Sequence, residues 1–197
     1  PGHMVFYDAY TQRRAGLRTA DDTWWMQVIA ARSGRLGVNC SGAGTLICGL
    51  GAGAGCSEQR TGCLGQNGAP DWILVAMGAN DWACGVPLGT AGTLDVRTFF
   101  GACQQMLRRL RAACPTAQVV LATLPRGRDP EDGPMFFNAE STGPIEPYNE
   151  VIRAACALEG GRVADLAAAC PTYSTLDGLH PVAAGMRQLA AGWLACL

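Results

Sequence analysis

Hydrophobic and polar positions follow two alternating patterns along the 197-residue chain. Two continuous apolar runs, residues 71–77 and 118–124, predict strands that are buried on both faces, as in a parallel sheet. Shorter apolar runs predict further strands at 5–7, 36–40 and 162–166. Helical spacing of apolar residues predicts helices at 24–32, 96–113, 148–158 and 181–196. Strands and helices therefore alternate along the chain.

Polar residues and prolines mark the ends of the predicted helices. Residues 21–23 offer an N-cap for the first helix, whereas Asp95 caps the second and Pro115 stops it. Pro181 opens the last helix at the first helical position, where its missing N–H costs nothing. The pattern as a whole predicts one α/β domain over residues 5–197, in which helices cover both faces of a five-stranded parallel sheet to give three layers, α/β/α.

Charge and composition exclude several classes of function. The formal net charge is -1, which argues against a basic nucleic-acid-binding protein. All fifteen basic residues are arginines, and the absence of lysine excludes Schiff-base, pyridoxal-phosphate and P-loop chemistry. Residues 36–57 carry no formal charge, but they are too rich in glycine and too poor in large apolar side chains for a membrane span.

The chain has ten cysteines, fewer than a small disulfide scaffold would carry. Four of them lie in apolar helical stretches and are predicted to be small buried hydrophobic residues: Cys103, Cys114, Cys156 and Cys196. Four others lie in glycine-rich segments, where disulfides are more plausible: Cys48, Cys56, Cys63 and Cys84. The even count favours an oxidising, extracytoplasmic compartment, with a cytoplasmic protein carrying free thiols as the alternative.

The chain contains two histidines, and one of them is set aside. His3 lies in Pro1-Gly2-His3-Met4, which is typical of a cloning remnant over residues 1–4. His180 is then the one histidine for catalysis, which excludes a multi-histidine metal site; no metal and no cofactor are expected. Asp177 precedes it by three residues, so a tight turn can bring the carboxylate to Nδ1 and leave Nε2 to act as a base. A surface loop with an incidental aspartate has the same pattern.

Polar segments follow the ends of the predicted strands or lead into helices, at the sheet edge where ligands bind in such folds. They are residues 8–11, 39–45, 78–81 and 177–181. The Asn80 amide follows a buried strand and a glycine, from where it can donate a hydrogen bond into a cleft; a turn-forming asparagine is the alternative. Gly44 presents an N–H without a side chain in the way, although a flexible turn explains it equally well.

In this order and spacing, the four segments resemble the SGNH, or GDSL-type, hydrolase family. The most specific parts are 77–81, similar to the G-x-N-D block of the family, and 177–181, similar to its D-x-x-H-P block. Residues 39–45 are similar to the second block, whose glycine best matches Gly44 and otherwise Gly42. The resemblance implies a flavodoxin-like fold and ester hydrolysis through an acyl-enzyme.

The same resemblance implies a role for each candidate site residue. His180 acts as the general base, Asp177 orients it, and the oxyanion hole consists of the N–H groups of Ala9 and Gly44 with the Asn80 amide. The first block departs from the family, because residues 7–9 read Tyr-Asp-Ala where the family has Gly-Asp-Ser. The alanine removes the nucleophile, since its methyl group cannot attack a carbonyl carbon.

Ala9 has three interpretations. The first is an engineered serine-to-alanine variant, which fits both the cloning remnant and the otherwise intact site. The second is a natural pseudoenzyme that binds esters or glycans without cleaving them. The third is a hydrolase in which His180 activates water directly. An enzyme of this type without its nucleophile retains some transition-state binding but loses most of its rate.

Other residues are candidates for substrate binding. They are Asp8, Trp82, Arg126 and Phe136. An aromatic ring at Trp82 can line an acyl or sugar pocket, with core packing as the alternative. Arg126 lies in a long polar segment, 126–147, that is typical of a lid or specificity loop. The expected partner is a small-molecule ester, an acylated lipid or an acylated sugar, with no nucleic acid, and the sequence does not separate lipase, thioesterase, deacetylase and acyltransferase chemistry.

Overall fold

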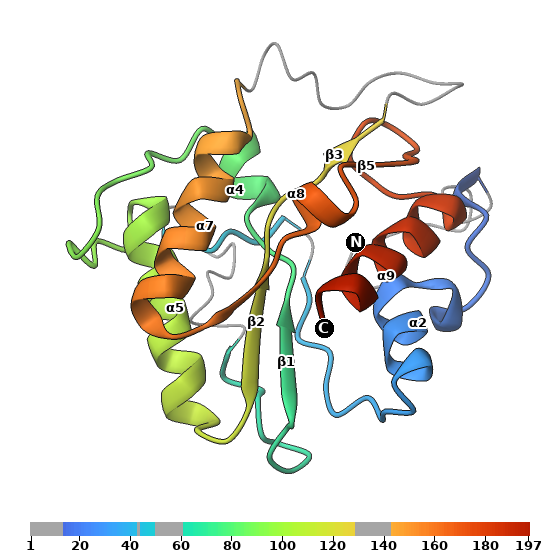
Figure 1. The fold of residues 1–197 in the computed structure, drawn as a ribbon, viewed down its shortest axis with the longest axis horizontal. Coiled ribbons are helices and arrows are strands. Elements are labelled where there is room, and N and C mark those ends of the chain that lie inside the picture. The colour runs from blue at the N-terminus through green and yellow to red at the C-terminus, as the bar shows by residue number, and fades with distance from the viewer. Residues whose placement is uncertain (1–13, 43, 50–60, 129–142) are drawn as a thin grey trace. The chain divides into compact units, whose positions relative to one another are not determined.

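The computed structural model describes residues 14–42, 44–49, 61–128 and 143–197 (Figure 1). These residues belong to two compact units. The first unit contains the described residues up to 42, residues 125–128, and residues 165–197. The second unit contains residues 44–124 and 143–164, without the undescribed segment 50–60.

A three-stranded parallel sheet forms the centre of the second unit. Its strands are β1 (Trp72–Val75), β2 (Gln118–Ala122) and β4 (Arg162–Ala164), in the order β1-β2-β4. The register places Val120 of β2 opposite Leu74 of β1 and Arg162 of β4. The middle position of β2 explains its continuous apolar sequence, because residues 119–122 are all buried.

Within the described residues, the second unit also contains the helices α4 (Ala79–Ala83), α5 (Phe99–Ala113) and α7 (Glu146–Glu159). The long helices α5 and α7 lie side by side beside the sheet (Figure 1). They share one hydrophobic core with the strands, in which Phe99, Leu107, Leu121 and Ile152 are fully buried. The core therefore fixes the carboxyl ends of β1 and β2, where the polar segments of this unit begin.

The first unit combines a helical part with a short ladder. Its helices are η2 (Ala20–Asp22), α2 (Trp24–Ala31), α8 (Leu166–Ala169) and α9 (Ala183–Cys196). Helices α2 and α9 pack against each other (Figure 1), and the ring of Trp24 stacks on Trp193 with centroids 5.1 Å apart. The ladder is parallel and joins β3 (Arg126–Gly127) to β5 (Thr172–Tyr173).

The α/β class and three of the predicted parallel strands are confirmed. The predicted strand at 5–7 lies outside the described residues. Residues 36–40 form no ladder with any described strand, and pairing with the strand predicted at 5–7 falls outside the described residues, so the strand at 36–40 stays a prediction.

Two helices begin later than predicted. Helix α5 is capped by Thr98, whose hydroxyl accepts a hydrogen bond from the Gly101 N–H, because the Asp95 carboxylate binds Arg97 instead. Helix α9 begins at Ala183 rather than at Pro181, because Pro181 forms an antiparallel bridge with Thr175. In both cases, the residue that was expected to begin the helix binds another partner: Asp95 binds Arg97, and Pro181 pairs with Thr175.

Short elements interrupt two segments that were predicted as uniform. The strand predicted at 162–166 ends at Ala164 and is followed by α8. The long loop predicted at 126–147 begins with β3. Helix α4, directly after Gly78, was also not predicted. These elements have two to five residues, which is too short for a hydrophobic period to be recognised.

The cysteine predictions are partly confirmed. Cys103, Cys114 and Cys156 are buried thiols as predicted, and Cys196 is half-buried. Cys63 is disulfide-bonded as expected, and so is Cys40. The disulfide prediction is wrong for Cys48 and Cys84, which carry thiols, and Cys56 lies outside the described residues. Cys48 is buried beside a core carboxylate, so it behaves as a small core residue.

Helices that could cross a membrane are absent from the part of the chain that the structure describes, since none is both long and apolar enough.

Candidate active site

The predicted Asp177–His180 pair is formed in the first unit. Asp177 Oδ2 lies 2.7 Å from His180 Nδ1. The second oxygen, Oδ1, accepts hydrogen bonds from the main-chain N–H groups of His180 at 2.8 Å and Leu179 at 3.1 Å. One carboxylate therefore holds both the turn and the ring, and its position opposite Nδ1 assigns the proton to that nitrogen.

The electrostatics of the pair favour an ionised Asp177. Partial burial opposes ionisation, but hydrogen bonds from the His180 ring and main chain outweigh it and hold the pKa of Asp177 below its ordinary value. Only 20% of the Asp177 side chain and 15% of the His180 side chain are exposed. The negative charge of Asp177 therefore faces the imidazole ring at close range.

The turn that carries this pair rests on the β3–β5 ladder. The Thr175 hydroxyl accepts a hydrogen bond from the Gly178 N–H at 2.8 Å and donates one to the carbonyl oxygen of Arg128. The buried Tyr173 hydroxyl, whose pKa is raised by burial, donates to the Leu179 carbonyl oxygen at 2.7 Å. Gly127 of β3 lies so close that an added Cβ would be 2.0 Å from the Gly178 carbonyl oxygen. The turn that carries Asp177 and His180, here called the dyad turn, is thus held by residues of or next to both β3 and β5.

The predicted Asn80 block lies in the second unit, at the start of α4. Gly78 caps the helix with φ 111°, a left-handed conformation that favours glycine, and an added Cβ would lie 3.1 Å from the Phe99 ring. Asn80 Nδ2 donates to the carbonyl oxygen of Thr45 at 2.8 Å. The side-chain amide is therefore held against the segment 44–48, in which the predicted Gly44 lies.

Asp81 binds the same segment from the interior. Its side chain is fully buried, and its two oxygens accept the N–H groups of Ile47 at 2.9 Å and Cys48 at 3.0 Å. Burial raises the pKa of Asp81, although these hydrogen bonds act in the opposite direction. The sequence pattern had pointed to Asp81 only as part of a block, whereas the structure identifies it as the residue that fixes 47–48.

Gly44 is exposed and adopts a left-handed conformation with φ 67°. No heavy atom lies within 4 Å of the position where its Cβ would be, so its backbone conformation, not lack of space, favours glycine here. Gly44 directly precedes Thr45, which accepts the Asn80 amide. The structure therefore places the Asn80 amide beside the residue that follows Gly44.

The predicted substrate-binding residues differ in placement. Trp82 is only 8% exposed, belongs to the core, and donates its indole N–H to the Gly143 carbonyl oxygen at 3.1 Å. This favours core packing, the alternative that the sequence left open. Arg126 is exposed on β3. Asp8, Ala9 and Phe136 lie outside the described residues.

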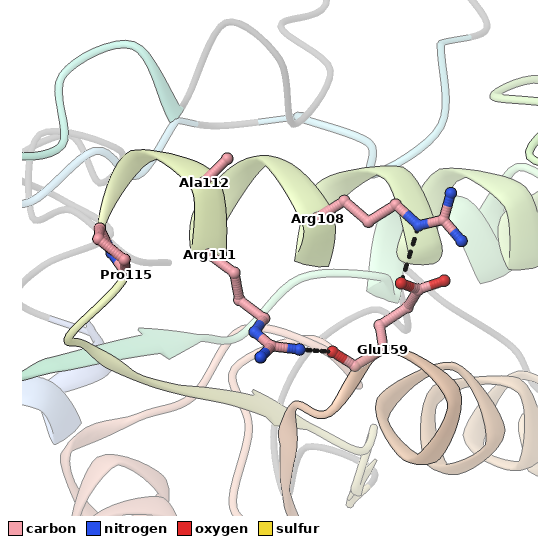
Figure 2. Close-up of a pocket in the computed structure, with 5 residues that line it drawn as sticks. All are labelled: Arg108, Arg111, Ala112, Pro115 and Glu159. Atoms are coloured by element: carbon pink, nitrogen blue, oxygen red, sulfur yellow. Dashed lines mark hydrogen bonds and ion pairs between the residues drawn. The ribbon is translucent and has the colours of Figure 1, made fainter.

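A pocket of about 350 Å³ lies elsewhere in the second unit, between the ends of α5 and α7 (Figure 2). Figure 2 shows Arg108 and Arg111 pointing to Glu159 across it. Arg108 Nε lies 2.8 Å from a Glu159 carboxylate oxygen, and Arg111 donates to the Glu159 carbonyl oxygen. None of the candidate catalytic residues lines this pocket. Both arginines are exposed.

Comparison with known proteins decides the family. A family model of GDSL-like lipases and acylhydrolases matches residues 8–188. The chain belongs to the GDSL-like lipase/acylhydrolase family. The matched range includes both the Asn80 block and the Asp177–His180 turn. No curated relative matches the sequence.

Solved structures show the SGNH hydrolase fold of this GDSL-family chain. A Lactobacillus plantarum protein is 24% identical, with a TM-score of 0.73 over 90% of this chain and 88% of its own. A Bacteroides ovatus protein named as a GDSL-like lipase is also 24% identical, with a TM-score of 0.64 over 90% and 78%. Phospholipase A1 of Streptomyces albidoflavus is 16% identical, with a TM-score of 0.53 over 98% and 92%.

Several residues around the GDSL-family blocks were not predicted from the sequence. Fully buried Asn149 binds both main-chain groups of Leu124, at the end of β2, with an Oδ1–N distance of 2.7 Å and an Nδ2–O distance of 3.1 Å. Thr175 and Gly127 support the dyad turn. A polar residue at an apolar position of a predicted helix, as at Asn149, is the sequence signal that could have indicated a supporting residue of this kind.

Proposed function

We propose that this chain is the scaffold of a serine ester hydrolase that lacks its nucleophile at Ala9. The main support for this proposal is the hydrogen bond of 2.7 Å between Asp177 Oδ2 and His180 Nδ1, within the block that resembles D-x-x-H-P. A carboxylate that fixes an imidazole in this way leaves Nε2 to exchange protons with a nucleophile. Family membership supports ester chemistry, since GDSL-like lipases and acylhydrolases cleave acyl esters.

The proposed reaction begins when a hydroxyl at position 9 attacks the ester carbonyl carbon. His180 Nε2 takes the hydroxyl proton, and Asp177 stabilises the imidazolium that forms. The tetrahedral intermediate then collapses: the carbon–oxygen bond to the leaving alcohol breaks, and His180 gives that alcohol its proton. Water attacks the resulting acyl-enzyme with the same base, which releases the acid and restores the hydroxyl.

The oxyanion of the intermediate is proposed to accept hydrogen bonds from Asn80 Nδ2 and from the main-chain N–H groups of Gly44 and residue 9. Asn80 Nδ2 carries two hydrogens, and one of them binds the Thr45 carbonyl oxygen, which orients the other. A donor that is fixed before the reaction stabilises developing charge without reorganisation. Removal of one such donor typically lowers kcat by about 100- to 1,000-fold.

The proposed substrates are small-molecule esters, acylated lipids or acylated sugars. A lipid is consistent with the fold of phospholipase A1 from Streptomyces albidoflavus, which this chain resembles at 16% identity. A short acyl group is the simplest test case because it places few demands on the acyl-binding pocket.

We also propose an extracytoplasmic location. The disulfide-bonded Cys40 and Cys63 support this location, because disulfides persist in oxidising compartments. Mass-spectrometric counting of alkylated thiols in protein from the native source would test it.

Ala9 favours a second candidate function. A natural pseudoenzyme with this site binds esters or glycans and does not cleave them. The intact dyad argues for the hydrolase, because a protein that only binds has no need of an ionised aspartate beside its histidine. The third possibility, His180 acting on water, predicts slow turnover in the protein with Ala9.

The decisive experiment is Ala9→Ser, assayed with p-nitrophenyl acetate and butyrate. We expect turnover at least about 1,000-fold above the protein with Ala9, because the nucleophile carries most of the rate of such enzymes. Ala9→Thr is the matched control, since it adds a bulkier hydroxyl at the same position. Absence of turnover by Ala9→Ser on both esters, with the protein folded, would contradict the hydrolase. Equal slow turnover by both forms would favour water as the nucleophile.

A further inference from the structure

We propose that Asp81 is a positioning residue that sets the geometry of the oxyanion hole. It acts through the segment 44–48, and the inference rests on the proposed function of Gly44 and Asn80. The distinguishing feature is that two consecutive residues of α4 bind this one segment. Asn80 binds it at Thr45, and Asp81 binds it at Ile47 and Cys48.

The three contacts form one clamp between the start of α4 and residues 45–48. Asn80 Nδ2 lies 2.8 Å from the Thr45 carbonyl oxygen, and the Asp81 oxygens lie 2.9 Å and 3.0 Å from the two N–H groups. Thr45, Ile47 and Cys48 are themselves buried, so water is a poor substitute for these partners. The distance between the Asn80 amide and the Gly44 N–H is therefore determined by this clamp.

A carboxylate suits this position for a specific reason. The N–H groups of Ile47 and Cys48 both need acceptors, and an ionised carboxylate offers two oxygens and no donor. An asparagine presents one oxygen and one NH₂ group, so one main-chain N–H would face another donor. Asp81 is fully buried and reaches neither solvent nor an exposed surface. Its effect on catalysis must therefore pass through the groups that it holds.

Gly44 is exposed and has a left-handed backbone, and no heavy atom lies within 4 Å of its Cβ position. On the C-terminal side of Gly44, side chains of α4 hold Thr45 and the two residues bound by Asp81. Loss of the carboxylate would release 47–48 and shift the Gly44 N–H relative to the Asn80 amide. Displacement of a catalytic group by about 1 Å lowers the rate by about 100-fold.

The test is Asp81→Asn in the Ala9→Ser protein, with kcat and KM measured on p-nitrophenyl acetate. We expect kcat to fall by about 10- to 100-fold while KM stays within about twofold, because oxyanion donors act mainly on the transition state. Values are corrected for the folded fraction at the assay temperature. An unchanged kcat in the folded variant would overturn the proposal.

Gln104→Ala is the matched control for loss of a buried polar side chain in the same unit. Gln104 is buried, accepts the Gly92 N–H at 3.0 Å and donates to Glu159 at 2.7 Å, and neither hydrogen bond involves residues 44–48. We expect it to lower stability and to leave kcat unchanged. Equal losses of kcat in Gln104→Ala and Asp81→Asn would overturn a specific role for Asp81.

A double-variant cycle separates positioning from general support. If Asp81 acts through the oxyanion hole, Asp81→Asn will lower kcat less in the Asn80→Ala protein than in the protein with Asn80. The reason is that Asn80→Ala has already removed part of the hole. Additive losses would contradict the proposal.

Amide hydrogen exchange of the protein with Ala9 tests the clamp without any activity. Asp81→Asn is expected to speed exchange at Ile47 and Cys48 by at least about tenfold, with Gly92 as the corresponding site for Gln104→Ala. If Ala9→Ser shows no turnover, the proposed function fails, and the exchange result alone decides whether Asp81 holds the segment. Unchanged exchange at Ile47 and Cys48 would overturn the clamp.

Discussion

Asp177 and Asp81 are both carboxylates in family blocks, but their surroundings differ. Asp177 is partly exposed, binds an imidazole with one oxygen, and has a lowered pKa. Asp81 is fully buried, binds main-chain N–H groups with both oxygens, and has a raised pKa. Asp177 therefore binds an imidazole, a side chain that can take up and release a proton. Asp81 binds only main-chain N–H groups, which do not exchange protons in catalysis.

The two aspartates therefore have different roles: Asp177 acts on the chemistry of the site, and Asp81 acts on its geometry. A carboxylate paired with a histidine changes what the ring can do with a proton. A carboxylate paired with two N–H groups changes only where the chain lies. Loss of Asp177 should therefore affect the rate of the reaction far more than the stability of the fold.

The largest effect is expected on the dyad in the Ala9→Ser protein. His180→Ala and Asp177→Asn should each lower kcat by about 10,000-fold, because the first removes the base and the second favours the wrong tautomer. Steady-state ester hydrolysis measures both, and circular dichroism verifies folding. A loss below about tenfold in Asp177→Asn would contradict its orienting role, because even a modest proton-transfer contribution is about 100-fold.

Asp81→Ala should have the larger effect on folding. It leaves the N–H groups of Ile47 and Cys48 buried without their acceptor, so the free energy of unfolding should fall by about 2–5 kcal/mol. Urea denaturation measures this change. Asp177→Ala is the matched comparison and should cost less, because its side chain is 20% exposed and water can replace it. The reverse order would break the contrast between the two aspartates.

Gly127→Ala should disturb the dyad turn from the side of β3. The new Cβ would lie 2.0 Å from the Gly178 carbonyl oxygen, so the turn must shift. In the Ala9→Ser protein we expect kcat to fall by about 10- to 100-fold. Gly37→Ala serves as the control, because no heavy atom lies within 4 Å of its Cβ position. Similar activities of the two variants would show that the turn tolerates displacement.

The pH dependence of stability should have opposite signs for the two aspartates. The pKa of Asp177 is lowered from 3.8, so its contribution is present above that value and is lost as pH falls through the folded pKa. The pKa of Asp81 is raised from 3.8, so the folded chain binds more protons and stability decreases as pH rises above 3.8. Urea titrations of Asp177→Asn and Asp81→Asn against the parent between about pH 3 and 7 measure both differences. Equal signs would contradict the contrast.

The smallest effect is expected at the pocket of Figure 2. Arg108 pairs with Glu159, but half of its side chain is exposed, so Arg108→Gln should change the free energy of unfolding by less than about 1 kcal/mol. Kinetics of the Ala9→Ser protein should not change. A larger loss of kcat would indicate that this surface contributes to the reaction.

Long, regular elements could be predicted from the sequence, and short ones could not. The apolar run around β2 and the helical spacing of α5 each span enough residues to indicate their type. Strand β3 has two residues and no pattern of its own. Residues 36–40 have a β-like composition, but composition alone does not supply the neighbour with which a strand must pair.

The candidate site shows the same division. The three-residue spacing of Asp177 and His180 lets a tight turn bring the two side chains together, so this contact could be predicted from local geometry. The role of Asp81 did not, because its partners lie 34 and 33 residues away in the chain. No local pattern encodes such a separation.

The sequence by itself therefore determined the chemistry that is present: one histidine for catalysis beside an aspartate, an amide after a buried strand, and an alanine where a nucleophile is expected. The tertiary structure alone decided which carboxylate supports a side chain and which supports the backbone. The physical reason is burial, because exclusion of solvent around Asp81 requires its partners to come from the fold, and those partners lie 34 and 33 residues away in the chain.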